Sequence, residues 1–167
     1  MQLSGTIHYF PKNVKVFVVL FLITLSFGFF TGFSFLHMTT SLTPNGIEKH
    51  YIGNENDEDA EEMIFKKSEK EILSIIHTHV LSFSLIFLAL GGILTTTSVN
   101  QKLKTFLLIE PSVSIILTFG SIWILWKGIL WLKYVIILSG ILLTASFILI
   151  VCLTLWQLIF VKGEYLT

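Results

Sequence analysis

The stretch that decides the fold is HTHVLSFSLIFLALGGILTTTSV, residues 77–99. From Val80 to Val99 the chain carries no charged side chain. A helix needs about 20 apolar residues to cross the hydrocarbon core of a bilayer. We therefore predict a transmembrane helix over residues 78–99, with two histidines at its start.

Three other apolar runs have the length of a membrane span, at residues 16–36, 105–126 and 130–161. Hydrophobic residues make up 53% of the 167-residue chain, which is typical of membrane proteins. The first run is longer than the core of a signal peptide and lacks a small-residue cleavage pattern. The chain is thus predicted to be an all-α integral membrane four-helix bundle with up-down-up-down topology and a single membrane domain.

The only long polar segment, residues 37–76, connects the first two spans. Residues 43–46, Thr-Pro-Asn-Gly, are typical of a turn. Residues 61–76 alternate apolar and charged residues as an amphipathic helix does, and we expect this helix to run into the second span or lie on the membrane surface. The acidic stretch 54–62 is either a solvated loop or the surface that docks a membrane complex or redox partner.

Composition excludes several classes of function. The chain has no arginine and a formal net charge of zero, so neither bidentate phosphate clamps nor nucleic-acid partners are expected. Cys152, the single cysteine, is predicted to be a packing residue. Nucleophile elbows, phosphate loops and zinc-protease motifs are absent from the sequence. We expect a protein that is not an enzyme by itself.

Lysines near the span ends predict the orientation. One group lies on a single side of the predicted bundle: Lys12, Lys15, Lys102, Lys104 and Lys162. Because lysines in short flanks favour the cytoplasm, we predict a bacterial cytoplasmic membrane, cytoplasmic termini and an outer loop at 37–76. Tryptophans around the connection between the last two spans resemble an interfacial belt.

Four histidines are predicted to lie on the outer side. His37 ends the first span, His77 and His79 begin the second, and His50 lies in the connecting segment. Antiparallel spans place His37 at the same depth as His77 and His79. Because ionisable residues are costly near hydrocarbon and imidazole binds metals well, these histidines are the leading candidates for a ligand site.

Helical phase separates His77 from His79. His77 shares a seven-residue repeat with Ser84, Gly91 and Ser98, and small residues mark helix contacts in membranes. His79 is about 200° away around an α-helix. We therefore expect His77 to face the bundle interior and to pair with His37, with His79 as the second choice.

Two ligands fit these histidines. A b-type haem held by His37 and either His77 or His79 would make the protein an electron carrier. Alternatively, His37, His50, His77 and His79 would bind copper or zinc. The competing hypotheses are interfacial histidines without a ligand, and a non-enzymatic accessory or assembly subunit of a membrane complex.

Glu110 is the only acidic residue within a predicted span. It is either a proton or quinone site or an interfacial residue at the true start of the span, with Pro111 in the first helical turn. The second interpretation is favoured because the predicted depth is shallow. Gln157 is expected to form a helix–helix hydrogen bond. Gly28 and Gly32 form a helix-packing pattern that also leaves room for a flat ligand. Because four helices bury modest area and several small-residue stripes remain available, a homodimer is one expectation.

Overall fold

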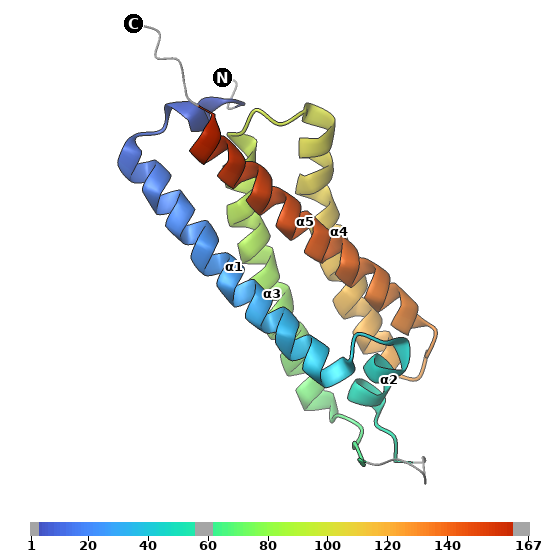
Figure 1. Ribbon diagram of the computed structural model, residues 1–167. Coiled ribbons are helices and arrows are strands. Elements are labelled where there is room, and N and C mark those ends of the chain that lie inside the picture. Colours follow the sequence, from blue (N-terminus) through green and yellow to red (C-terminus); the bar gives the residue numbers. More distant parts are fainter. Residues whose placement is uncertain (1–3, 56–61, 162–167) are drawn as a thin grey trace, which may run out of the picture.

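The computed structural model describes residues 4–55 and 62–161, and every regular element within them is a helix. A short 3-10 helix, η1, spans Thr6–Tyr9. The α-helices are α1 (Lys12–Thr40), α2 (Pro44–Ile52), α3 (Glu69–Thr95), α4 (Gln101–Trp126) and α5 (Leu132–Phe160). All except η1 and α2 are long and apolar enough to cross a membrane. Successive long helices run in opposite directions (Figure 1), which confirms the predicted four-helix bundle.

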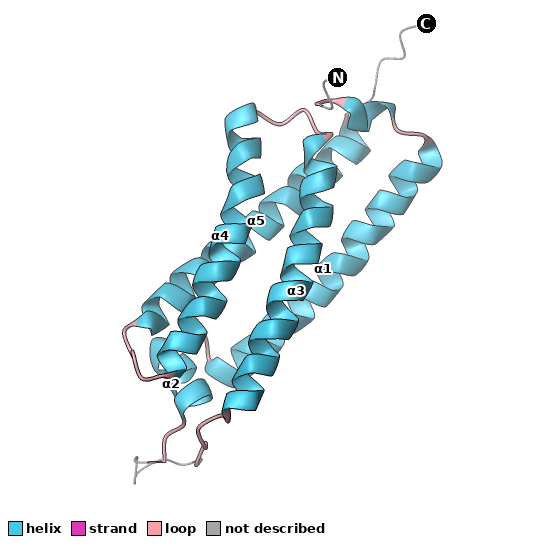
Figure 2. Cartoon of the chain, turned by 180° about the vertical axis from the view of Figure 1, so that it is seen from behind, coloured by secondary structure: helices cyan, strands magenta, loops and turns pink. Residues whose placement is uncertain are grey.

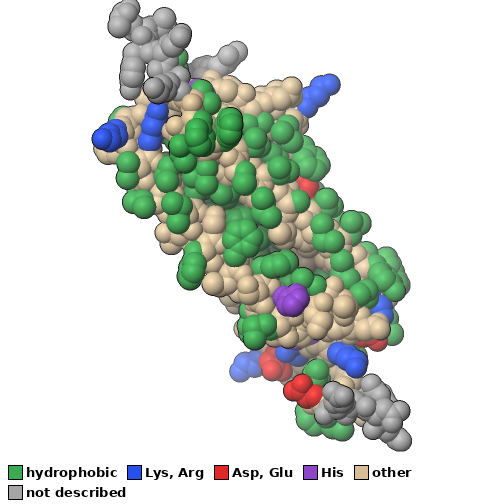
Figure 3. Space-filling model, viewed as in Figure 1, with side chains coloured by type: hydrophobic (Ala, Val, Ile, Leu, Met, Phe, Trp, Pro, Cys, Tyr) green, Lys and Arg blue, Asp and Glu red, His purple; other side chains and the backbone are tan. Residues whose placement is uncertain are grey.

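The bundle has two distinct ends. The short helix η1, the end of α5 and the α3–α4 connection lie at one end, called here the terminal end (Figure 1). The short helix α2, the start of α3 and the α4–α5 connection lie at the other, the α2 end (Figure 2). Lysine side chains gather at these ends, and hydrophobic side chains cover the surface between them (Figure 3). This distribution is the one that a bilayer requires.

The helices differ in how tightly they pack. The most extensive contact is between α4 and α5, followed by that between α3 and α4, whereas α1 mainly contacts α2 and α5. Aromatic side chains attach α1 to the bundle: Phe29 stacks on Phe147 of α5 at 3.8 Å between ring centroids and meets Phe83 of α3 edge-on at 6.2 Å. The bundle is therefore built around α4 and α5, with α1 at its margin.

The predicted turn at residues 43–46 is instead the start of α2. The Thr43 hydroxyl accepts a hydrogen bond from the Gly46 amide at 3.0 Å, and Pro44 occupies the first turn. Proline suits that position because its missing N–H has no partner there in any helix. A Cβ on Gly46 would lie 1.8 Å from the Thr40 carbonyl oxygen, so only glycine lets α2 fold back against the end of α1.

The predicted helix over residues 61–76 begins later than expected. Ser68 and Glu71 form a capping box that starts α3 at Glu69, because each side chain binds the other's backbone N–H. Residues 63–67 have no regular secondary structure, and the Asn54 side-chain oxygen accepts a hydrogen bond from the Ile64 amide at 2.6 Å. The prediction was therefore wrong for residues 62–68, and residue 61 lies outside the described residues.

At the terminal end, residues 5–7 lie across the end of α3 and bind its last carbonyl groups. The amides of Gly5 and Ile7 donate to the carbonyls of Thr97 and Thr96. The buried Lys104 ammonium donates to the Thr97 carbonyl at 2.7 Å. A lysine at a helix C-terminus satisfies carbonyls that lack an intrahelical partner and opposes the helix dipole. The N-terminal residues and Lys104 therefore provide hydrogen-bond donors for the carbonyl groups at the end of α3.

Candidate functional sites

His79 is the histidine that the structure orients most clearly. Its Nδ1 lies 2.8 Å from the backbone carbonyl oxygen of Ile75. A carbonyl oxygen only accepts hydrogen bonds, so Nδ1 carries the proton, and whenever the ring has a single proton Nε2 presents a lone pair. The ring also lies 5.5 Å from that of Phe119 on α4. One nitrogen is thus fixed by the backbone, and the other has the electronic form of a metal ligand.

The predicted inward-facing stripe on α3 is wrong. His77, Ser84 and Ser98 are exposed, and only Gly91 of that repeat is buried. The buried face consists of larger apolar residues: Ile72, Phe87, Leu90 and Leu94. His79 lies one turn before Phe83, whose ring contacts Phe29 and Phe119. Aromatic packing, rather than close approach at small residues, sets the phase of α3, and it leaves His79 exposed with its ring beside that of Phe119 on α4.

His37 lies on the neighbouring helix at the same end of the bundle. It is exposed near the C-terminus of α1. The Phe29–Phe83 contact aligns the two antiparallel helices. From that contact, His37 lies about two turns, and His79 about one turn, toward the α2 end. The structure thus places these two histidines on adjacent helices at neighbouring depths.

His50 is separate from this pair. It is half-buried in α2, and its ring meets that of Tyr51 edge-on at 4.8 Å. Burial, and then the positive charge of Lys67, lower the pKa of His50 below its usual value. Burial also raises the pKa of Tyr51 to about 12. Both groups are therefore uncharged at neutral pH, which favours their packing between α2 and the bundle.

The described part of the chain, which includes all four of these histidines, contains no group of three or more His, Cys, Asp or Glu side chains that could hold a metal ion. The four-histidine copper or zinc site therefore lacks the gathering of ligands that it requires. A metal that is already held by a macrocycle needs only two histidine ligands, so its site would not form a group of three or more such side chains.

Glu110 lies well inside the membrane-spanning part of α4. The helix begins at Gln101, earlier than predicted, with Asn100 as its N-cap. Glu110 consequently falls in the third turn, and Pro111 is inside the helix. The interpretation of Glu110 as an interfacial residue before the first turn is therefore wrong. The polar residues before Thr105 concealed the true start of the helix.

The Glu110 side chain is enclosed by two serines. It is 8% exposed, and its carboxyl oxygens accept hydrogen bonds from Ser114, on α4, and from Ser146, on α5. Two turns further along α4, the hydroxyl of Thr118 bonds to that of Ser139 on α5 at 2.7 Å. The closest helix pair in the bundle is therefore joined by a ladder of buried polar contacts.

Sequence reasoning missed the serines of α5. Ser139 and Ser146 are seven residues apart, the repeat expected of a helix–helix seam, and this spacing was the available signal. The expected Gln157 hydrogen bond exists, but its oxygen accepts from the Ser98 backbone amide at 2.7 Å. Gln157 therefore joins α5 to the α3–α4 connection.

The chain belongs to the Aq_1264_TM family, described as a transmembrane helical domain, whose model matches residues 41–165. This match includes His50, His77, His79 and Glu110, whereas α1 with His37 precedes it. No curated protein and no solved structure shows a significant match. The protein is thus a small integral membrane protein whose helices contact the lipid bilayer.

Proposed function

We propose that this protein is a non-enzymatic electron-transfer subunit that binds one b-type haem at the α2 end, with His79 as the first axial ligand and His37 as the second. The observation that carries the proposal is the hydrogen bond from His79 Nδ1 to the Ile75 carbonyl. Such a bond fixes the tautomer and the ring orientation of a ligating histidine and raises its basicity.

The surroundings of His79 suit a planar apolar ligand. Phe83 and Phe119 contact its ring, and α1 lies across from it without close helix packing. Two imidazoles give iron an electron-transfer coordination whose potential depends on burial and hydrogen bonding. Lys67 belongs to the segment that precedes α3 at this end and is the candidate partner for a haem propionate.

The test is the absorption spectrum of the detergent-purified protein after expression with haem supplementation. We expect a Soret band and the sharp α-band of six-coordinate reduced haem. His79→Ala should abolish that spectrum, whereas His77→Ala, which removes another exposed histidine of the same helix, is the matched control and should retain it. A protein without a Soret band, or equal loss in both variants, would reject the proposal and leave a haem-free accessory subunit.

For the orientation, we propose that both termini face the cytoplasm of a bacterial cell and that the α2 end faces outward. The support is the lysine distribution at the terminal end, including Lys12, Lys15 and Lys102. This orientation can be tested by replacing Glu55 with cysteine and treating intact cells with a membrane-impermeant thiol reagent. Labelling at Glu55 without labelling of a cysteine introduced at Lys12 is expected, and the reverse pattern would invert the assignment.

A second proposal concerns Glu110 as a proton-binding site. Ser114 and Ser146 can donate to an ionised carboxylate, and either hydroxyl can instead accept from the protonated acid. The site therefore satisfies both charge states without moving a helix. Infrared difference spectra between acidic and alkaline samples should show a carboxylic-acid carbonyl band that Glu110→Gln removes. Spectra that are identical for the variant and the native protein would contradict this assignment.

A further inference from the structure

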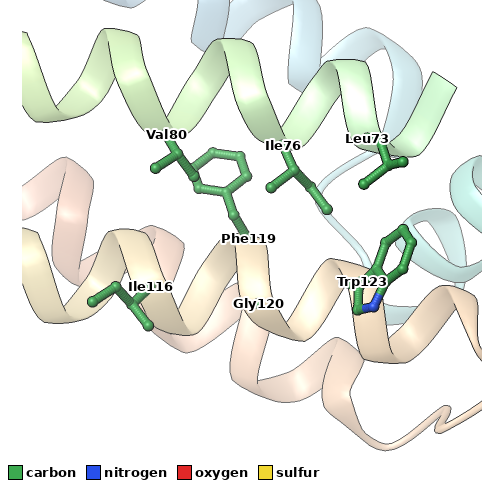
Figure 4. A pocket seen from close by; sticks show the side chains of 7 residues that line it. All are labelled: Leu73, Ile76, Val80, Ile116, Phe119, Gly120 and Trp123. Carbon is green, nitrogen blue, oxygen red and sulfur yellow. The ribbon is translucent and has the colours of Figure 1, made fainter. Parts of the chain in front are cut away.

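A groove on the outside of the bundle separates α3 from α4 near the α2 end. Leu73, Ile76 and Val80 of α3 form one wall, and Ile116 and Trp123 of α4 form the other (Figure 4). The groove has a volume of about 390 Å³ and an almost entirely apolar lining. Gly120 also lines the groove, and a Cβ at this position would meet nothing within 4 Å, so a side chain there would extend into open space.

The occupant must be hydrocarbon because of where the groove lies. Its α3 wall, from Leu73 to Val80, is about 10 Å long at 1.5 Å per residue. The hydrocarbon core of a bilayer is about 30 Å thick, so the groove covers much of one leaflet. Water gains no hydrogen bonds from such a lining. An acyl chain has the shape and chemistry to fill it.

Positive charge is concentrated where the groove ends at the membrane surface. The Lys127 ammonium lies 4.8 Å from the ring centroid of Trp123, which lines the groove, and 4.6 Å from that of Trp126. Lys66 lies 4.9 Å from the same Trp126 ring. The Trp126 indole N–H donates to the Lys67 carbonyl at 2.8 Å, which fixes the ring between the two lysines.

Carboxylates lie close to both lysines. Glu69 lies 3.7 Å from the Lys127 ammonium, and the Glu55 carboxylate accepts a hydrogen bond from the Lys66 backbone amide at 2.9 Å. The two ammonium groups themselves lie together over the Trp126 ring, at the head of an apolar groove. This combination matches an anionic phospholipid, whose phosphate needs cations at the same level at which its acyl chain needs an apolar surface.

We infer that this groove binds one anionic phospholipid, with an acyl chain between α3 and α4 and its headgroup phosphate beside Lys66 and Lys127. Phe119 separates the groove from His79: its ring lines the groove and also contacts the His79 ring. The lipid site is therefore distinct from the proposed haem site and does not depend on it.

Native mass spectrometry of the full-length protein in detergent tests this inference, with phosphatidylglycerol and phosphatidylcholine of identical acyl chains as probes. We expect a one-lipid adduct that favours phosphatidylglycerol. In the Lys66→Gln/Lys127→Gln double variant, the preference for phosphatidylglycerol should fall at least about fivefold. This factor corresponds to the roughly 1 kcal/mol that a single lysine near the membrane surface contributes. Lys102→Gln, at the terminal end, should keep it.

Filling the groove tests the acyl-chain part. Gly120→Leu should reduce binding of both lipids, whereas Gly92→Leu, which also adds a side chain where nothing lies within 4 Å, should not. Circular dichroism and the thermal midpoint verify that each variant is folded. Equal binding of the two lipids by native protein, or unchanged binding by Gly120→Leu, would overturn the inference. Because the adduct mass identifies lipid directly, absence of haem would not affect this result.

Discussion

Helices α1 and α4 both cross the membrane, yet they use their polar residues in opposite ways. Of its most apolar 18-residue window, α1 has 11% buried inside the protein and α4 has 50%, although α4 is the least apolar of the four spans. In α4, Glu110, Ser114 and Thr118 face α5, whereas Ser34 of α1 bonds only to its own helix. In lipid, where apolar side chains lose little by staying exposed, paired polar contacts distinguish a core helix from a marginal one.

The largest effect that tests this comparison is expected when the carboxyl group of Glu110 is removed. Glu110→Ala should lower the free energy of unfolding by about 1–3 kcal/mol, because it leaves the buried hydroxyls of Ser114 and Ser146 without their partner. Unfolding in mixed detergent micelles, followed by tryptophan fluorescence, measures this change. Glu110→Gln, which keeps a polar group at this position, should lower the free energy of unfolding much less than Glu110→Ala does. A Glu110→Ala variant as stable as the native protein would remove the distinction between α4 and α1.

A smaller effect is expected one step along the polar ladder. Ser139→Ala removes the hydrogen bond to Thr118 and should cost about 0.6 kcal/mol, a typical value for such bonds between membrane helices. Ser34→Ala on α1 is the matched control, since its hydroxyl bonds only to the Phe30 carbonyl of the same helix. Equal effects of the two substitutions in the micelle assay would show that α1 and α4 do not differ in this respect.

The attachment of α2 should depend on pH. Because burial and Lys67 lower the pKa of His50 in the folded state, the unfolded chain binds a proton more readily. Stability from this contact is thus full above about pH 6.5, the ordinary histidine value, and falls as the pH drops toward the folded-state pKa. The protection factors of the α2 amides, which correct hydrogen exchange for its intrinsic pH dependence, should fall on acidification, and His50→Gln should abolish this fall. Protection factors that rise in acid would reverse the sign.

The smallest effect on folding is expected at the glycines of α1. Gly28 and Gly32 are exposed, and a Cβ at either position would meet nothing within 4 Å. Replacing both by leucine should leave the unfolding free energy unchanged within about 0.5 kcal/mol. If the predicted homodimer packs through this face, the same variant should lose energy transfer between labelled copies in liposomes. Retained transfer would assign dimerisation to another surface or exclude it.

The sequence predicted the spans and their order because long uncharged runs have no other stable place than the bilayer. It did not predict α2, since Thr43 and Pro44 are as typical of a helix start as of a turn, and the contact between Gly46 and Thr40 decides between them. The orientation of His79 was missed because aromatic packing, which depends on neighbouring helices, sets the phase of α3. Glu110 was placed too shallow because polar residues at the start of α4 resembled a loop.

The stack of Phe29 on Phe147 also bears on biosynthesis. In synthesis from the N-terminus, α1 precedes both of its aromatic partners, Phe83 of α3 and Phe147 of α5. Until these helices follow, α1 lies in lipid without them. A helix whose hydroxyls bond to its own carbonyls, as those of Ser26, Thr31 and Ser34 do, exposes no unsatisfied polar group while it waits. The helix that contributes least to the core is thus the one best suited to exist without it.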